Sequence, residues 1–270
     1  MKYRIGEIAN MLGVSAEAVR YFEKIGLIHP TRDEESGYRL YEVGEHNILM
    51  RARGYSRFGF TLAEAAELIA NGDLADLTAA LKEREAPLKE SIRQQMLLLR
   101  CLKRRREHLE RVCALGERFR VETSPPLYGV LYRRGYEFMQ KEGMSAQVRE
   151  WAEKKPFAEA LLVYKKETIL AGGKGYYLGL CMEEEFAKAF GVDRQAGVEY
   201  FPPRKSVYSL RRIPHERAVE SDLPRSFAPT LAFLKEQGLK LAGDSCGRTL
   251  HTSKKNGEYV HYCEQWFPVE

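Results

Sequence analysis

Apolar residues repeat every seven positions along a highly charged stretch in the middle of the chain. The register is carried by Leu74, Leu81, Leu88, Leu102 and Leu109, with Gln95 in the remaining slot. A second register, three residues further on, is only partly apolar, with Leu77, Leu98 and Val112 among polar residues. A period of 3.5 residues on a charged helix is typical of a helix that pairs with another helix. The pattern predicts a helix over residues 76–120, which at roughly 40 residues would be about 60 Å long and would project from a globular domain.

Pro87 lies inside this predicted helix. A proline in a helix interior removes a backbone hydrogen bond and costs about 3 kcal/mol or more. We therefore expect a kink or a break near Ala86, with the paired segment strongest from Leu88 to Val112.

Shorter helical repeats precede the long helix. Apolar spacing predicts helices over residues 5–12 and 16–25, separated by Gly13 and by Ser15, an N-cap candidate. Two short helices joined in this way form a helix-turn-helix pattern. Pro30 and the turn 31–37 follow, and residues 38–41 then alternate polar and apolar as a short strand does. The pattern predicts a hairpin wing directly after the second helix, and further helices over residues 42–55 and 62–70.

Polar side chains gather on the second helix and the wing. Arginine offers a bidentate fork to phosphate oxygens, and a tyrosine hydroxyl adds a donor. Taken singly, such an arginine is more often a solvated surface residue and such a tyrosine more often half-buried. Their clustering favours contact with a nucleic-acid backbone by Arg20, Tyr21, Tyr38, Arg39 and Tyr41.

The part after a linker at residues 122–126 shows weak internal repetition. The first half has an apolar run at 127–132, a helix near 145–155 and strands at 160–164 and 176–183. The second half has a strand at 206–211, a helix near 226–237 and strands at 248–252 and 258–269. Two such β-α-β-β units can pair their sheets and leave a groove suited to a ligand. The expected fold class is α+β, with domains over 1–75, 76–120 and 121–270.

Glu264 stands in the last predicted strand, where alternation places it on one face with Tyr262 and Trp266. A carboxylate on an inward face is costly unless it is paired. A cationic ligand would supply the pairing, with help from the aromatic rings. The alternative is a structural glutamate bonded to a tyrosine or an arginine, because alternation does not tell which face is inside.

Composition narrows the class of protein. The net charge of +5 on 270 residues is too mild to indicate nucleic-acid binding by itself. There is no apolar run of the ~20 residues that a membrane span needs and no signal peptide, so we expect a cytoplasmic protein without membrane contact. Five widely spaced cysteines predict neither disulfides nor a metal site. No nucleophile triad is visible, and we expect no cofactor and no enzymatic activity.

The N-terminal motifs resemble the DNA-binding domain of the MerR family of transcription regulators. The resemblance covers residues 1–72 and rests on IGEIA at 5–9, RYFE at 20–23, GLI at 26–28 and GYRLY at 37–41. It implies that the second helix enters the major groove and that the wing grips the backbone, with Ser15, Arg20, Tyr21, Tyr38, Arg39 and Tyr41 at the DNA. It also implies a homodimer through residues 76–118, promoter DNA as a partner, and activation in which the protein distorts the DNA so that RNA polymerase can engage.

Residues 125–270 resemble the GyrI-like effector domain, through the duplicated β-α-β-β pattern, the segment PPRKSVYSLRRIPH at 202–215 and EQWFPV at 264–269. The resemblance implies a multidrug sensor that binds a bulky, lipophilic, often cationic compound with aromatics around a buried glutamate. Glu264 matches that glutamate, and Trp266, Tyr262, Tyr132 and Tyr208 are expected from the pattern to line the pocket. Two alternatives remain open, a GyrI-like hydrolase that uses Glu264 as an acid–base group and a binder that sequesters drugs.

Overall fold

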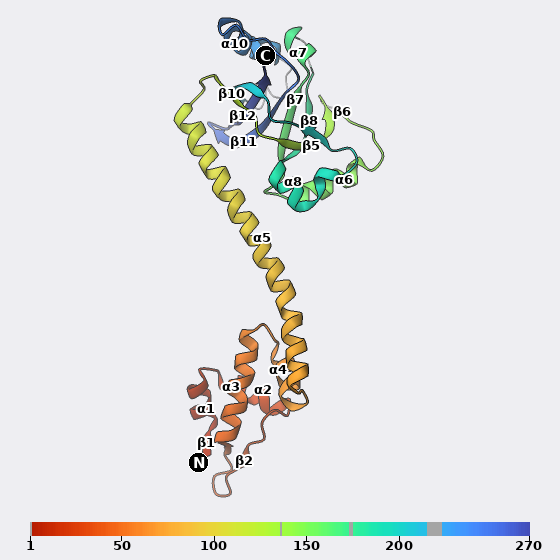
Figure 1. Ribbon diagram of the computed structural model, residues 1–270. Helices are drawn as coiled ribbons and strands as arrows, with labels where there is room; N and C mark the ends of the chain where they lie inside the picture. The colour runs from red at the N-terminus through yellow and green to blue at the C-terminus, as the bar shows by residue number, and fades with distance from the viewer. Residues whose placement is uncertain (1, 136, 173–174, 215–222) are drawn as a thin grey trace. The chain divides into compact units, whose positions relative to one another are not determined.

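The computed structural model describes residues 2–135, 137–172, 175–214 and 223–270. The chain divides into two compact units, Met1–Gln94 and Gln95–Glu270. The division falls inside the long helix α5 (Leu74–Leu115), which Figure 1 shows in yellow and orange. The predicted class, α+β with an N-terminal helix-turn-helix part, a long helix and a C-terminal sheet domain, is confirmed.

The N-terminal unit is a helical cluster with a small sheet. Its helices are α1 (Ile5–Leu12), α2 (Ala16–Lys24), α3 (Val43–Arg57) and α4 (Leu62–Ala70), and its strands are β1 (Lys2–Arg4), β2 (Thr31–Arg32) and β3 (Arg39–Glu42). The strands lie in the order β1-β3-β2, so β2 and β3 form the wing that was predicted after α2. One face of each helix packs into a single core that includes Ile8, Val19, Phe22 and Leu49.

The junction between α1 and α2 follows from its sequence. Gly13 ends α1 with φ of 60°, a left-handed conformation that glycine adopts without steric cost. The Ser15 hydroxyl accepts a hydrogen bond from the Ala18 backbone N–H at 3.2 Å and caps α2. Thr61 and Glu64 form a capping box at the start of α4.

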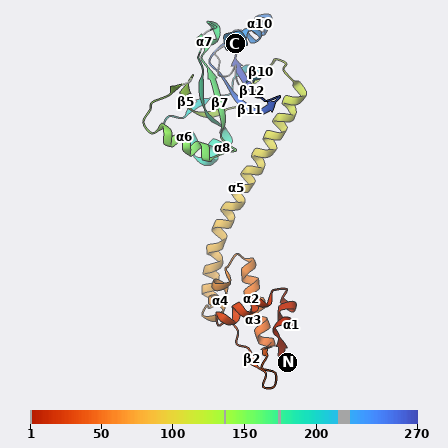
Figure 2. The ribbon, with the colours of Figure 1, turned by 180° about the vertical axis from the view of Figure 1, so that it is seen from behind.

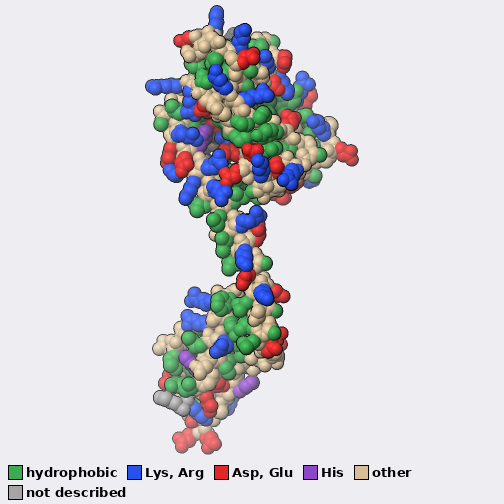
Figure 3. Space-filling view, viewed as in Figure 1, with side chains coloured by type: hydrophobic (Ala, Val, Ile, Leu, Met, Phe, Trp, Pro, Cys, Tyr) green, Lys and Arg blue, Asp and Glu red, His purple; other side chains and the backbone are tan. Residues whose placement is uncertain are grey.

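Helix α5 continues through Pro87, so of the kink or break expected near Ala86 the break does not occur. Its apolar residues divide between two environments. Leu88, Ile92, Met96, Leu99 and Leu102 are half or more exposed and form a stripe on one side of the helix, visible as green along α5 in Figure 3. Val112, which the sequence placed in the helix-pairing seam, is instead 5% exposed against Tyr208 and Trp266 of the C-terminal unit.

The C-terminal unit is built on one antiparallel sheet. Its first half comprises β5 (Leu127–Arg134), α6 (Met144–Glu153), β7 (Glu159–Tyr164) and β8 (Tyr177–Glu183). Its second half comprises β10 (Lys205–Pro214), α10 (Leu223–Glu236), β11 (Ser245–Lys255) and β12 (Glu258–Pro268). The strand order β4-β10-β12-β11-β7-β8-β5-β6 joins the two halves through β7 and β11. The predicted duplication of a β-α-β-β unit is therefore confirmed, except that His215 of the second motif lies outside the described residues.

Shorter elements complete this unit. They are β4 (Arg120–Thr123), β6 (Glu137–Phe138), α7 (Lys166–Leu170), α8 (Glu184–Phe190), the 3-10 turn η1 (Val192–Arg194) and β9 (Glu199–Phe201), which pairs with β5. Figure 2 shows the same elements from behind.

The pleat of the sheet separates two sets of side chains. Val207 and Phe267 pack with Phe227 and Leu234 of α10 on one face. The neighbouring positions Tyr208 and Trp266 lie on the opposite face, where they pack against Val112 of α5. The second face also carries the side chain of Glu264, two residues from Trp266 along β12.

Candidate functional site

The first candidate site consists of exposed polar side chains on α2 and on the wing of the N-terminal unit. Arg20 is exposed on α2, and Tyr38 and Arg39 are exposed at the wing. The Arg39 Nε donates to Glu23 Oε1 at 2.9 Å, and the Arg4 guanidinium lies 5.3 Å from the centroid of the Tyr38 ring. The hydrogen bond from Arg39 to Glu23 ties the wing to α2. Helix and wing thus present cationic and phenolic groups from neighbouring elements.

Tyr41 differs from the other predicted contacts of this unit. Its side chain is 0% exposed in the core, and its hydroxyl lies 3.5 Å from Glu23 Oε2. The difference is one of position along the wing, because Tyr38 and Arg39 lie toward the turn between β2 and β3, whereas Tyr41 packs in the helical core. The structure therefore corrects the expectation that Tyr41 presents its hydroxyl to a phosphate. Ser15 acts as a cap, and Tyr21 is 38% exposed on α2.

The second candidate site surrounds Glu264 of the C-terminal unit. This carboxylate is 0% exposed and therefore faces inward, a point that alternation along the strand had left open. Arg248 Nε donates to Glu264 Oε1 at 2.8 Å. His108 Nε2 of α5 lies 2.6 Å from Glu264 Oε2. Because an ionised carboxylate only accepts hydrogen bonds, the His108 Nε2 must carry the proton in this contact.

Arg248 is the centre of the charge network. Its Nη1 donates to Glu159 Oε2 and to Glu183 Oε1, each at 2.9 Å, in addition to the bond from Nε to Glu264. The three carboxylates come from β7, β8 and β12, and the arginine from β11 between them. A buried arginine with three carboxylate partners leaves negative charge in excess at this face of the sheet.

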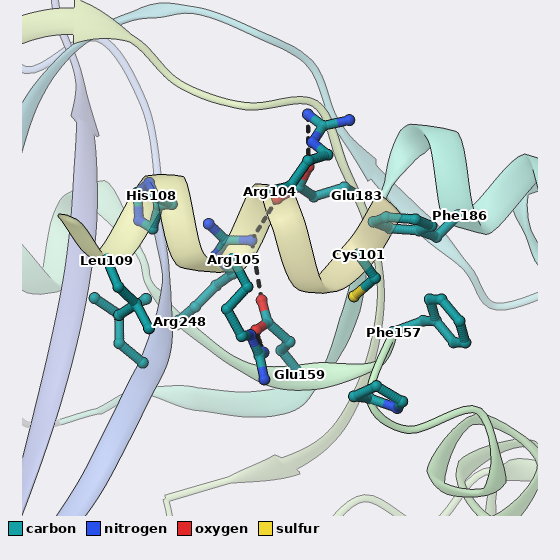
Figure 4. Close-up of a pocket in the computed structure, with 12 residues that line it drawn as sticks. Cys101, Arg104, Arg105, His108, Leu109, Phe157, Glu159, Glu183, Phe186 and Arg248 are labelled. Atoms are coloured by element: carbon teal, nitrogen blue, oxygen red, sulfur yellow. Dashed lines mark hydrogen bonds and ion pairs between the residues drawn. The ribbon is translucent and has the colours of Figure 1, made fainter. Parts of the chain in front are cut away.

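Helix α5 supplies the compensating positive charge. Arg104 contacts Glu183 at 2.8 Å and Glu185 at 2.6 Å, and Arg105 forms an ion pair with Glu159. Arg100 bonds the other oxygen of Glu185 at 2.6 Å. Figure 4 shows α5 crossing the strands, with Arg105 directed toward Glu159 and Arg104 beside Glu183.

These charges set the protonation state of the glutamate. Burial alone would raise the pKa of Glu264, but the charge of Arg248 and the contacts with His108 hold that pKa below its ordinary value. For Arg248, burial would lower the pKa, and the carboxylates of Glu264 and Glu183 raise it instead. Both groups are therefore ionised at neutral pH.

The predicted aromatic residues divide into those near Glu264 and those elsewhere. Trp266 Nε1 donates to Glu122 Oε1 at 2.8 Å, and its ring packs edge-on against Tyr208 at a centroid distance of 5.6 Å. The Arg120 guanidinium lies 4.3 Å from the centre of the Tyr208 ring. Burial first, and then the nearby charge of Glu264, raise the pKa of Tyr208.

Tyr132 does not join this cluster. It lies on β5, four strands from β12 in the sheet order, which at ~4.8 Å per strand is roughly 19 Å away. Its ring stacks on Phe138 at 6.3 Å instead. Tyr262 is half-buried on β12, two residues before Glu264, with the Arg212 guanidinium 5.8 Å from its ring centre.

Two of the hollows that α5 lines also border Arg248. One, of about 30 Å³, lies among Arg104, Arg105, His108, Glu159 and Glu183. The other, of about 180 Å³, lies between α5 and Trp266, with Arg120 and Glu122 in its wall. Pockets for drug-sized ligands are typically ~300–1,000 Å³. With α5 in place, the face around Glu264 therefore has room for water or a small group only.

The alternative of a glutamate bonded to an arginine agrees with the contact from Arg248, but sequence reasoning identified neither Arg248 nor His108 as the partner of Glu264. The turn Asn256-Gly257 has positive φ at both residues, as a tight hairpin between β11 and β12 requires. Counting back from that turn would place Arg248 opposite Gln265, on the other face. A bulge at Leu250 shifts the register by one residue, so that Arg248 pairs with Glu264. No sequence signal identified His108, which was one polar position on a charged helix.

Among the described residues, no group of three or more His, Cys, Asp or Glu side chains could hold a metal ion. Within the same residues, no helix combines the length and the apolar character needed to cross a membrane.

Comparisons with known proteins place the N-terminal unit in a family. A model of the MerR family regulatory proteins matches residues 4–41. The mercuric resistance operon regulatory protein of Bacillus cereus is 41% identical over 69 residues, 26% of this chain and 52% of that protein. Heavy metal-dependent transcription regulator 2 of Rhizobium meliloti is 34% identical over 104 residues, 37% of this chain and 71% of that protein. The chain thus spans about half the length of the first of these relatives.

A cryo-EM structure of an EcmrR–DNA complex aligns with 99% of this chain and 99% of its own, at a TM-score of 0.35 and 15% identity. A TM-score at that level assigns no function. The identity with the R. meliloti regulator over 71% of its length, together with the helix-turn-helix and wing, does assign the family. The chain belongs to the MerR family of regulatory proteins.

Proposed function

We propose that this protein is a dimeric transcription regulator that binds promoter DNA with its N-terminal unit and senses a lipophilic, often cationic compound with its C-terminal unit. The observation that carries the DNA part is the exposure of Arg20, Tyr38 and Arg39 on α2 and the adjoining wing. Charge-assisted bonds from such side chains to phosphates give affinity and fix the register of a protein on the duplex.

Dimerisation would use the exposed apolar stripe of α5. A row of leucine, isoleucine and methionine side chains on a solvent-facing helix is stabilised by burial against a second helix. We propose that the stripe meets its copy in a second chain. Two copies of α2 would then reach two half-sites of a promoter. Distorting the DNA between them would cost a few kcal/mol and would let RNA polymerase engage.

The effector part rests on the buried carboxylate Glu264 beside Trp266 and Tyr208. Both of its oxygens are engaged by Arg248 and His108. Such engagement disfavours general acid–base chemistry, which needs a carboxyl group within reach of the reacting atom. We therefore favour a binding role over hydrolysis for this site.

The DNA assignment can be tested by gel shift and fluorescence anisotropy on a promoter fragment that holds an inverted repeat. We expect Arg20→Ala and Arg39→Ala each to weaken binding about tenfold, because each removes a charge-assisted bond. Each should also reduce the slope of the logarithm of the binding constant against the logarithm of the salt concentration by about one, because one phosphate contact is lost.

Arg194→Ala is the matched control, since Arg194 has a side chain that is 90% exposed in the C-terminal unit. Its affinity for the fragment should equal that of the unaltered protein. If Arg20→Ala and Arg39→Ala bind as tightly as Arg194→Ala, then α2 and the wing are not the DNA-contacting surface.

A further inference from the structure

The exposed face of α2 carries one carboxylate among cationic and phenolic side chains. Its exposed residues recur at spacings of three, four and seven positions: Glu17, Arg20, Tyr21 and Lys24. Residues at these spacings share one face of a helix. The other face packs into the core of the N-terminal unit through Val19 and Phe22. Glu17 is therefore an anion on the same face as groups that are proposed to contact DNA.

Glu17 lies in the first turn of α2, two residues after the Ser15 cap. Hydrogen bonds from its own backbone N–H and from the Ser15 hydroxyl hold the pKa of its carboxyl group below the ordinary value of 4.5. The group is therefore ionised at neutral pH, and an ionised carboxylate only accepts hydrogen bonds. An acidic residue in a first helical turn also interacts favourably with the helix dipole, and this structural role is the alternative to a contact with DNA.

In the proposed DNA complex, on which this inference rests, the first turn of α2 faces base edges in the major groove, as the start of a recognition helix does. A carboxylate there is repelled by the phosphates and loses its hydration. Its presence is unfavourable unless a hydrogen-bond donor on a base compensates. Arg20 lies nearly one turn further along the same face and is available for a phosphate.

Base edges in the major groove differ in the donors that they offer to a carboxylate. Cytosine presents its N4 amino group as a donor, whereas guanine presents O6 and N7, and thymine presents O4, as acceptors. Adenine has a donor at N6, but its N7 acceptor lies beside that donor. A glutamate is thus matched by cytosine, whereas a glutamine, which both donates and accepts, is matched by adenine.

We propose that Glu17 selects cytosine at one base pair of each half-site by accepting a hydrogen bond from the N4 amino group. Arg20 then supplies affinity that is independent of sequence, and Glu17 supplies discrimination between sequences. The Ser15 hydroxyl donates to the Glu17 carboxylate and accepts from the Ala18 backbone N–H. Ser15 is therefore a positioning residue for this carboxylate.

The test begins with selection of DNA by the full-length protein from a library of duplexes that hold two randomised, inverted half-sites. Fluorescence anisotropy then gives the dissociation constants of the selected duplex and of its derivatives, in which each half-site position carries each of the four bases in turn. At one position, we expect the unaltered protein to bind the cytosine duplex about tenfold more tightly than the other three, as one good base contact provides.

Substitution of Glu17 should change the preferred base. Glu17→Gln should prefer adenine about tenfold over cytosine at that position, because an amide pairs with N6 and N7 of adenine. Glu17→Ala should bind the four duplexes about equally. Because Glu17 bonds a base and no phosphate, neither substitution should reduce the slope of binding against salt concentration, whereas Arg20→Ala should.

Glu83→Gln is the matched control, because it makes the same chemical change at an exposed position of α5. This variant should keep the cytosine preference of the unaltered protein. Far-UV circular dichroism checks that each variant is folded, and Glu17→Ala and Glu17→Gln test the same contact independently.

The outcomes separate this inference from the proposed function. A cytosine preference that Glu17→Gln and Glu17→Ala both retain overturns base selection by Glu17, assigns this residue to the helix dipole and leaves DNA binding standing. Absence of a cytosine preference at every half-site position of the unaltered protein also overturns it. Failure of the unaltered protein to bind any duplex overturns both this inference and the proposed DNA binding.

Discussion

At the scale of single residues, Glu264 shows how a buried charge is retained in this protein. Its two oxygens are bonded by Arg248 and His108, and each partner comes from a different element. Removing one member of a buried pair leaves the others without a counter-charge, which is more costly than losing an exposed ion pair. The stability of the C-terminal unit should therefore depend on the ionisation of this carboxyl group.

We expect Glu264→Gln to lower the free energy of unfolding by about 3 kcal/mol at pH 7, measured by urea denaturation. The pKa of Glu264 is held below its ordinary value of 4.5. A depressed pKa in the folded state contributes stability above pH 4.5 and loses it as the pH falls through the folded value. The difference between the variant and the unaltered protein should thus shrink below pH 4.5. A difference that stays constant down to pH 3 would contradict this assignment.

At the scale of elements, α5 has an exposed apolar stripe on one side and packs against the C-terminal unit on another. Its Leu88–Leu102 stripe faces solvent, while Cys101, His108 and Val112 face the sheet. The seven-residue register predicted the helix itself. It assigned Leu109 and Val112 to helix pairing, because period alone does not reveal which partner covers a residue.

The stripe can be tested by the state of association. Leu99, which is 52% exposed, should become buried in a dimer. Leu99→Asp removes about 1.5 kcal/mol of apolar burial from each of two copies, so the dimer dissociation constant should rise about 100-fold in sedimentation experiments. Leu170→Asp, at a leucine of similar exposure on α7, should leave association unchanged. Equal dissociation constants for the two variants would rule out the stripe as the dimer interface.

At the scale of the whole molecule, each compact unit has a core of its own. The N-terminal core is formed by α1 to α4 and the wing, and the C-terminal cores by the two halves of the large sheet. Units with separate cores do not unfold as one two-state system.

Differential scanning calorimetry should therefore record a calorimetric enthalpy of unfolding larger than the van't Hoff enthalpy. A promoter fragment that binds the N-terminal unit should raise the transition of that unit alone, because a ligand stabilises the state to which it binds. A single transition that the fragment shifts as a whole would show that the units unfold together.

Much of the architecture was predictable because it depends on local patterns. The apolar spacing of α1 and α2, the Ser15 cap and the Gly13 terminus fix the helix-turn-helix within a few residues of sequence. Alternation along β12 placed Glu264 and Trp266 on one face, and the repeated strand pattern gave both β-α-β-β units.

Contacts between distant residues were decided by the tertiary structure alone. Tyr41 is buried because the helices close over β3, and Arg248 reaches Glu264 because a bulge at Leu250 moves the strand by one residue. His108 and Glu264 are 156 residues apart in the chain, and no local pattern links them. Periodicity specifies which side chains share a face, whereas the partner of that face is selected by packing across the whole unit.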